Sequence, residues 1–397
     1  MTPLLLKAFT ATSCIGGGLA QTLVSLRTQR SGLRRCDFET VELATHIGAV
    51  AGIDAQALPY EWRRYDCRNN RLAELALRQD GFCDAVRDAA ARYGARRVGV
   101  FLGTSTAGIL QTELAYRQRD PLTGTLPEAF DYRGSHNTFS VVEYVRRRLR
   151  LDGPAAAVSA ACASSAKAFA AGRRMIEAGL VDAALVGGVD SLCLTTLYGF
   201  HSLQLLAAAP CRPFDVARDG LSIGEAAAFA LLERVPQSLA SDAVLLAGTG
   251  ESNDAHHMSA PHPQGRGAQL AMRAALSAAS LDPGAIDYIN LHGTGTPSND
   301  RAESGAVHGV FGSAVPCSST KGATGHTLGA AGALEAIISA LCLQNGLLPG
   351  GAQTVQVDPG LAVHYITRNR RARARRVLSN SFGFGGANCS LIFTTAG

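Results

Sequence analysis

Short apolar segments alternate with helical stretches in two successive parts of this 397-residue chain, and this order limits the folds that it can adopt. In the first part a helix over 164–178 is predicted to follow the second of four strand-like segments, 98–102, 155–160, 183–188 and 226–232. In the second part the strand-like segments are 286–291, 315–319, 378–382 and 388–394, with a helix over about 327–344. This alternation predicts an α/β fold with mostly parallel, buried sheets. We place the division between halves 1–240 and 241–397.

Composition limits the class of protein. Hydrophobic residues make up 47% of the chain and aromatic residues 6%, so a large core of small aliphatic side chains is expected. No apolar run approaches a membrane span, and the first fifteen residues lack the basic start of a signal peptide. Ten scattered cysteines without a C-x-x-C pair suit a reducing compartment, which predicts a cytoplasmic protein. The net charge of +5 is mostly arginine, but no aromatic pattern accompanies it, so we expect no nucleic-acid partner.

One cysteine stands where an apolar segment ends and a helical stretch begins. Cys162 is flanked by alanines and serines, which leave room for a substrate. A helix start places the positive end of the helix dipole and free backbone N–H groups behind the sulfur, and both favour the thiolate, which is the nucleophilic form. A buried structural cysteine is the alternative, because cysteine is among the most buried residue types.

Two further runs supply partners for an activated thiol. His292 follows an apolar segment and enters a turn rich in glycine and threonine, and Lys321 and His326 lead into a second helix start. A single histidine at a strand end is commonly a satisfied polar residue. Two such histidines together with a cysteine are typical of thiol nucleophilic catalysis.

These runs, with Arg212–Gly220 before Gly224-Glu225 and the glycine-rich segment 380–388, resemble the β-ketoacyl-[acyl carrier protein] synthases of the Cys-His-His type. Five motifs occur in the family's order. The resemblance implies a thiolase-like fold of five layers, α-β-α-β-α, built from two pseudo-repeated halves. It also implies a decarboxylative Claisen condensation between an acyl group held on Cys162 and malonyl-acyl carrier protein.

The resemblance assigns roles to the site residues. Cys162 is the nucleophile, and its oxyanion hole consists of the N–H groups of Cys162 and Phe384. His292 and His326 donate to the enolate, and Lys321 organises their hydrogen bonds. The carboxylates expected to support this group are Glu335 and Glu303.

Substrate and partner contacts also follow from the resemblance. Thr294 and Thr296 are expected to bind the phosphopantetheine arm, while turn stabilisation by their hydroxyls is an equal alternative. Phe200 and Phe382 are expected to gate the acyl channel. The predicted surface for docking an acidic acyl carrier protein consists of Arg63, Arg64 and Arg68. We expect no metal and no cofactor beyond the substrates' phosphopantetheine, and either a homodimer or a heterodimer with a chain-length-factor-like paralogue.

Three departures from the housekeeping enzymes favour a specialised branch, namely Leu221, Ala226 and Ala163. The runs 66–71 and 292–300 resemble ketosynthases of aryl-polyene pathways. A chain-length factor typically lacks the cysteine, and a thiolase needs a second catalytic cysteine in a Cys-x-Gly context, whereas Cys389 is followed by Ser390. The acyl-CoA-primed Cys-His-Asn synthases are disfavoured by histidine at both partner positions.

Overall fold

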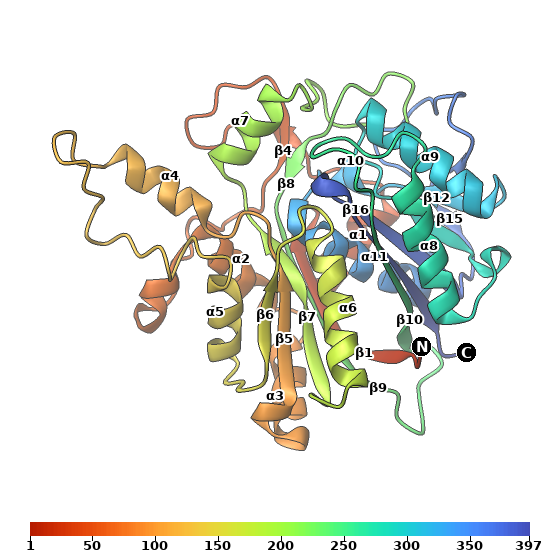
Figure 1. The fold of residues 1–397 in the computed structure, drawn as a ribbon, viewed down its shortest axis with the longest axis horizontal. Helices are drawn as coiled ribbons and strands as arrows, with labels where there is room; N and C mark the ends of the chain where they lie inside the picture. The colour runs from red at the N-terminus through yellow and green to blue at the C-terminus, as the bar shows by residue number, and fades with distance from the viewer.

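A computed structural model describes residues 1–397, and its central feature is one sheet in which the same strand order occurs twice (Figure 1). The first half runs β1-β9-β7-β5-β6 and the second runs β10-β17-β16-β11-β12. If the five strands of each half are numbered along the chain, their order across the sheet is first, fifth, fourth, second and third in both halves. The fold is therefore the predicted thiolase-like one, built from two pseudo-repeated halves.

Eight of the strands below agree with the predicted segments to within a few residues, whereas β1 and β10 were not predicted. In the first half they are β1 Leu4–Ser13, β5 Val98–Gly103, β6 Ala155–Val158, β7 Ala183–Asp190 and β9 Ala226–Arg234. In the second half they are β10 Val244–Asn253, β11 Tyr288–Asn290, β12 Pro316–Ser318, β16 Arg376–Phe382 and β17 Ala387–Thr395. The halves meet where β1 pairs antiparallel with β10, in the register Leu4 opposite Leu246.

The prediction of mostly parallel sheets is wrong. β5 pairs in parallel with β6 and β7, and β11 pairs in parallel with β12 and β16. By contrast, β9 runs antiparallel to β7 and β1, and β17 runs antiparallel to β16 and β10. The reason is that β16 returns into β17 through a short glycine-containing turn, as predicted for this hairpin, and β9 also lacks a crossover helix against the sheet.

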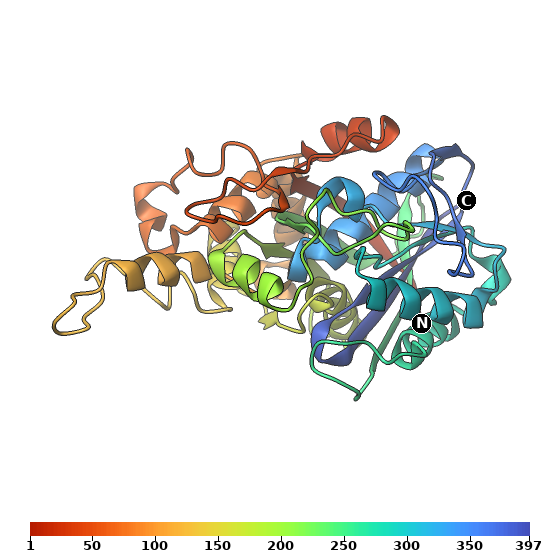
Figure 2. The ribbon, with the colours of Figure 1, turned by 90° about the horizontal axis from the view of Figure 1, so that it is seen from above.

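Helices form three layers around the two halves of the sheet (Figure 2). The central layer holds α6 (Ser164–Glu177) and α11 (Ala331–Asn345), which pack on each other and on both halves. One outer layer holds α2 (Arg68–Leu77), α3 (Phe82–Tyr93) and α5 (Ser140–Arg148), and the other holds α8 (Arg266–Ala279) and α9 (Pro297–Phe311). This is the expected α-β-α-β-α order.

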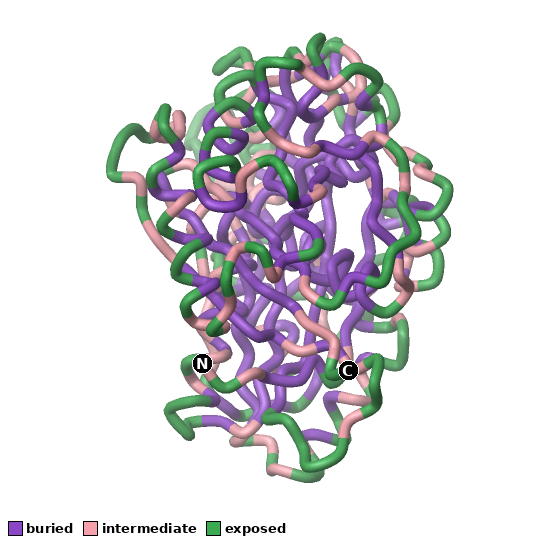
Figure 3. Tube along the Cα trace, turned by 90° about the vertical axis from the view of Figure 1, so that its right-hand side faces the viewer, coloured by how far each residue is buried: buried purple, intermediate pink, exposed green.

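The core follows these layers. The largest apolar cluster, of 42 buried residues, fills the space around the central helices, and clusters of 26 and 19 lie under the outer layers. Figure 3 shows the buried trace through the interior and the exposed trace at its rim. The stretch 328–345 is apolar and long enough to span a membrane by composition, but it is 89% buried and includes α11.

Candidate active site

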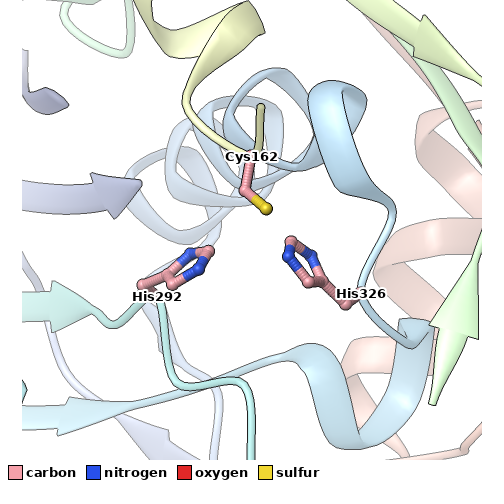
Figure 4. Close-up of side chains that lie close together, drawn as sticks. All are labelled: Cys162, His292 and His326. Carbon is pink, nitrogen blue, oxygen red and sulfur yellow. The ribbon is translucent and has the colours of Figure 1, made fainter. Parts of the chain in front are cut away.

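Three elements deliver Cys162, His292 and His326 to one place (Figure 4). Cys162 lies between β6 and α6, and His292 follows β11. His326 lies between the short α10 (Lys321–Thr324) and the 3-10 turn η4 (Leu328–Ala330). The sulfur and one ring nitrogen of each histidine are within 4.8 Å of one another. The structure thus brings together the predicted nucleophile and both predicted histidines.

Backbone geometry projects the thiol into this space. Ala161, directly before Cys162, has a φ of +48°, a left-handed conformation that non-glycine residues rarely adopt. On the facing turn, a Cβ on Gly383 would lie 2.9 Å from the Ala160 carbonyl and 3.1 Å from the Cys162 nitrogen. Only glycine permits this approach, and the N–H of the next residue, Phe384, lowers the pKa of the Cys162 thiol.

The thiol is not a resting thiolate. Burial raises the pKa of Cys162 to about 11, although the charge of Lys321 and the Phe384 N–H both oppose the rise. The prediction that the helix start favours the thiolate therefore describes a smaller effect than desolvation. The thiol must therefore lose its proton during its attack on a substrate.

The two imidazoles are suited to hydrogen bonding with a substrate oxygen. Burial, followed by the neighbouring charge of Lys321, holds the pKa of His292 and of His326 well below the usual value, so both rings are neutral. The ring centroids are 5.1 Å apart and the ring planes are nearly perpendicular. A neutral imidazole can accept a proton at one nitrogen and donate from the other.

Lys321 ties the group together. Its Nζ donates to the His292 carbonyl at 2.6 Å, lies 3.5 Å from His292 Nδ1, and forms a buried ion pair with Glu335. Burial raises the pKa of Glu335 to about 7, and the Lys321 charge opposes this rise. Glu335 thus acts on the histidines through Lys321.

Glu303 reaches the site through the backbone. From α9 it accepts the N–H groups of His292 at 2.8 Å and Gly293 at 2.7 Å. Asp300, one turn earlier on α9, accepts from the Gly295 N–H at 3.2 Å and from the Phe214 N–H at 2.8 Å. Asp300 was not predicted. Its sequence signal is an acidic residue in the first turn of the helix that follows the histidine turn.

A small pocket, with a cavity volume of about 50 Å³, opens onto these side chains. Thr294 and Thr296 line it, and their hydroxyls lie 2.9 Å apart. Phe200 stacks on Phe384 with ring centroids 5.5 Å apart, and Phe382 also lines the wall. Sequence reasoning missed some lining residues, because no local motif marks them: Leu205, Asp254, Ser259, Ala260 and Pro261.

The chemistry of the donor set bears on metal binding. Cys162, His292 and His326 could in principle hold a thiophilic ion. The Nζ of Lys321 lies 3.5 Å from His292 Nδ1, and its positive charge would oppose a cation at that position. The arrangement fits acyl transfer to sulfur better than metal binding.

The structure contradicts one docking residue. Arg68 is 5% exposed and forms a buried two-pronged ion pair with Glu225, so its assignment to a docking surface is wrong. Arg63 and Arg64 are exposed, and Arg64 pairs with Asp131 at 2.9 Å. They line a hollow separate from the Cys162 cavity.

Comparisons place these features among known proteins. The sequence matches the family models "Beta-ketoacyl synthase, N-terminal domain" over 71–238 and "Beta-ketoacyl synthase, C-terminal domain" over 243–354. Nodulation protein E of Rhizobium meliloti (strain 1021) is 38% identical over 331 residues, 81% of this chain and 80% of that protein. A mitochondrial 3-oxoacyl-[acyl-carrier-protein] synthase of Arabidopsis thaliana is 38% identical over 270 residues, 64% of this chain. The matched region spans 59% of the Arabidopsis protein, less than two thirds of its length.

Solved structures are similar over the whole chain. A ketosynthase in complex with its chain length factor, from Xenorhabdus doucetiae, has a TM-score of 0.90 at 38% identity and covers 100% of this chain and 98% of that one. The ishigamide ketosynthase/chain length factor has a TM-score of 0.89 at 29% identity, with 100% of both chains covered.

Proposed function

The chain belongs to the beta-ketoacyl synthase family, and from this premise we propose that it condenses an acyl thioester with malonyl-acyl carrier protein. First, Cys162 attacks the acyl thioester, and the carrier thiol leaves with the proton. Next, malonyl thioester loses CO₂, and the released electron pair forms an enolate. The enolate carbon then attacks the acyl carbon on Cys162, the thiolate leaves, and 3-oxoacyl-carrier protein results.

One observation carries this proposal: the sulfur of a buried thiol and one nitrogen of each of two neutral imidazoles lie within 4.8 Å of one another, and the Phe384 backbone N–H lowers the pKa of the thiol. In the acylation step the carbonyl oxygen becomes an oxyanion, and the N–H groups of Cys162 and Phe384 are the donors for it. A preorganised donor of this kind is typically worth about 3 kcal/mol. In the second step His292 and His326 donate to the enolate oxygen, each from the protonated nitrogen of its neutral ring.

The reaction involves no change in oxidation state, and decarboxylation supplies the carbanion without a strong base. We therefore propose that no metal and no redox cofactor takes part, and that the phosphopantetheine arm of the carrier presents both substrates. Thr294 and Thr296, at the wall of the cavity, are the proposed hydrogen-bond donors to this arm. The aryl-polyene branch remains our proposal for the pathway.

The test separates the two half-reactions. Purified protein is incubated with acyl-carrier and malonyl-carrier thioesters, and 3-oxoacyl-carrier is measured by mass spectrometry beside released CO₂. Product requires both substrates. CO₂ without 3-oxoacyl product would leave only a malonyl decarboxylase, as expected of a partner subunit. A thiolase is disfavoured, because Cys389 is buried in β17 and does not line the cavity.

We also propose that a second ketosynthase-like chain covers one side of the molecule, either a copy or a chain-length-factor-like paralogue. β6 ends the strand order and has no neighbour on its outer edge. α4 (Ile109–Arg117) and the loop after it project from the body (Figures 1 and 2), with Tyr116, Leu122 and Tyr132 exposed. Light scattering after size-exclusion chromatography tests this, and a stable monomer that remains active would contradict it.

A further inference from the structure

The carboxylate of Asp190 lies at the end of β7, where the two halves of the molecule meet close to the active site. It is fully buried, and its hydrogen-bond partners are all neutral donors. From the turn after β5 it accepts the hydroxyl of Thr104 at 2.7 Å, the N–H of Ser105 at 2.9 Å and the N–H of Thr106 at 3.0 Å. The Ser105 and Thr106 hydroxyls also donate to it, at 2.5 and 2.9 Å.

A further donor comes from the other half of the molecule. The N–H of Gly329 donates to Asp190 Oδ2 at 2.6 Å, across 139 positions of sequence. Gly329 lies in η4, the first turn of the helical stretch that continues into α11 and that begins directly after the His326 segment. A Cβ on Gly329 would lie 2.6 Å from Asp190 Oδ2, so glycine is required for this approach.

We propose that Asp190 is a positioning residue that clamps the 104–106 turn to Gly329 and so fixes His326 opposite Cys162. This inference rests on the proposed function, because His326 is taken as one of the reacting groups. Two hydrogen bonds hold the His326 backbone on one side. The His326 N–H donates to the Ser222 carbonyl at 2.7 Å, and the Gly224 N–H donates to the His326 carbonyl at 2.9 Å. On the other side, the Gly329 contact is the anchor.

The backbone between His326 and Gly329 shows why an anchor is needed. Leu328 has a φ of +52°, in the left-handed region that a branched residue avoids. Such a conformation is unfavourable and persists only where the surrounding contacts fix it. The carboxylate of Asp190 supplies such a contact one residue later.

The charge of Asp190 also reaches the thiol. Burial is the main reason that the pKa of Cys162 is raised to about 11, and the negative charge of Asp190 adds to the rise. Removing this charge should therefore lower the pKa of the thiol. A purely structural residue without charge would not have this effect, so the pH dependence of thiol alkylation separates the two roles.

Asp190→Asn keeps the shape but turns an acceptor oxygen into a donor that faces other N–H groups. We expect Cys162 to be acylated still, while the kcat for malonyl-carrier decarboxylation falls by about tenfold to a hundredfold, the scale of a misplaced catalytic group. The midpoint of iodoacetamide alkylation at Cys162 should move to lower pH. Asp182→Asn is the matched control: this carboxylate precedes β7, pairs with Arg97 and should change neither readout.

A folded Asp190→Asn protein with an unchanged kcat and an unchanged alkylation midpoint would overturn the proposal. The alkylation assay contains no acyl substrate, so its result tests the role of Asp190 even if the enzyme does not catalyse the proposed condensation. If Asp190→Asn does not fold, Ser105→Ala removes one hydroxyl donor and keeps the charge. Hydrogen–deuterium exchange over 326–330 must then rise, and unchanged exchange there would equally overturn the clamp.

Discussion

The ion pair between Lys321 and Glu335 is buried on every side, so removing one charge should destabilise the protein far more than removing both. The two side chains are 1% and 3% exposed. In Lys321→Met the Glu335 carboxylate loses its cation, and the His292 carbonyl loses a donor at 2.6 Å. Breaking a buried pair at one partner costs about 3–5 kcal/mol. We expect urea unfolding of Lys321→Met at pH 8 to show a loss of that size.

The double variant Lys321→Met/Glu335→Leu is the matched comparison. Apolar residues of similar volume often replace a buried pair at little cost, so it should recover most of the unfolding free energy. Decarboxylation of malonyl-carrier protein should stay impaired in both variants, because neither variant has the Lys321 ammonium group that donates to the His292 carbonyl. A double variant as unstable as Lys321→Met, or a single variant with near-normal turnover, would refute this reasoning.

The remaining predictions concern the histidines, the thiol and the partner surface. His292→Ala and His326→Ala should each be acylated by acyl-carrier substrate yet lose decarboxylation by at least about a hundredfold; loss of acylation too, in folded variants, would make them thiol activators. The buried His326 ring stays neutral, whereas an unfolded histidine is protonated near pH 6.5. The free energy of unfolding of wild type should therefore exceed that of His326→Gln by less as the pH falls below 6.5. Urea unfolding at pH 7.5 and 5.5 measures this, and a constant difference between the two proteins would contradict it. Iodoacetamide should alkylate Cys162 with a midpoint well above that of a free thiol, since its pKa is about 11; a midpoint near neutrality would show a resting thiolate. Arg63→Glu/Arg64→Glu should raise the KM for carrier-bound substrate about tenfold and leave a small pantetheine thioester unaffected; unchanged carrier kinetics would move docking to another face.

Eight strands and the two central helices were predictable because local patterns determine them, whereas β1 and β10 were not predicted. The helix predicted over 164–178 is observed as Ser164–Glu177, and the apolar segments are strands bounded by polar or glycine-rich turns. The direction of the strands was not predictable from the same signals. Whether a strand pairs parallel or antiparallel depends on the path of the chain between strands, and neither the β7 to β9 connection nor the β16 to β17 turn contains a crossover helix against the sheet.

The residues that sequence reasoning misjudged depend on distant contacts. Arg68 resembles a surface arginine in its local sequence, but Glu225, 157 positions later, holds it in the core. Asp190 carries no motif, and its partners come from two segments far away in sequence. The pKa of Cys162 shows the same limit, since the helix start is visible locally whereas burial exists only after the halves have packed.

Formation of an acyl-enzyme at Cys162 is the central claim, and intact-mass analysis tests it most directly. Wild-type protein is incubated with a panel of acyl-carrier thioesters, digested and mapped, beside Cys162→Ala and a control that replaces another buried cysteine, Cys342→Ala. We predict one acyl adduct on the peptide that contains Cys162, its loss in Cys162→Ala and its retention in Cys342→Ala. An acylated mass that persists in Cys162→Ala would contradict the account.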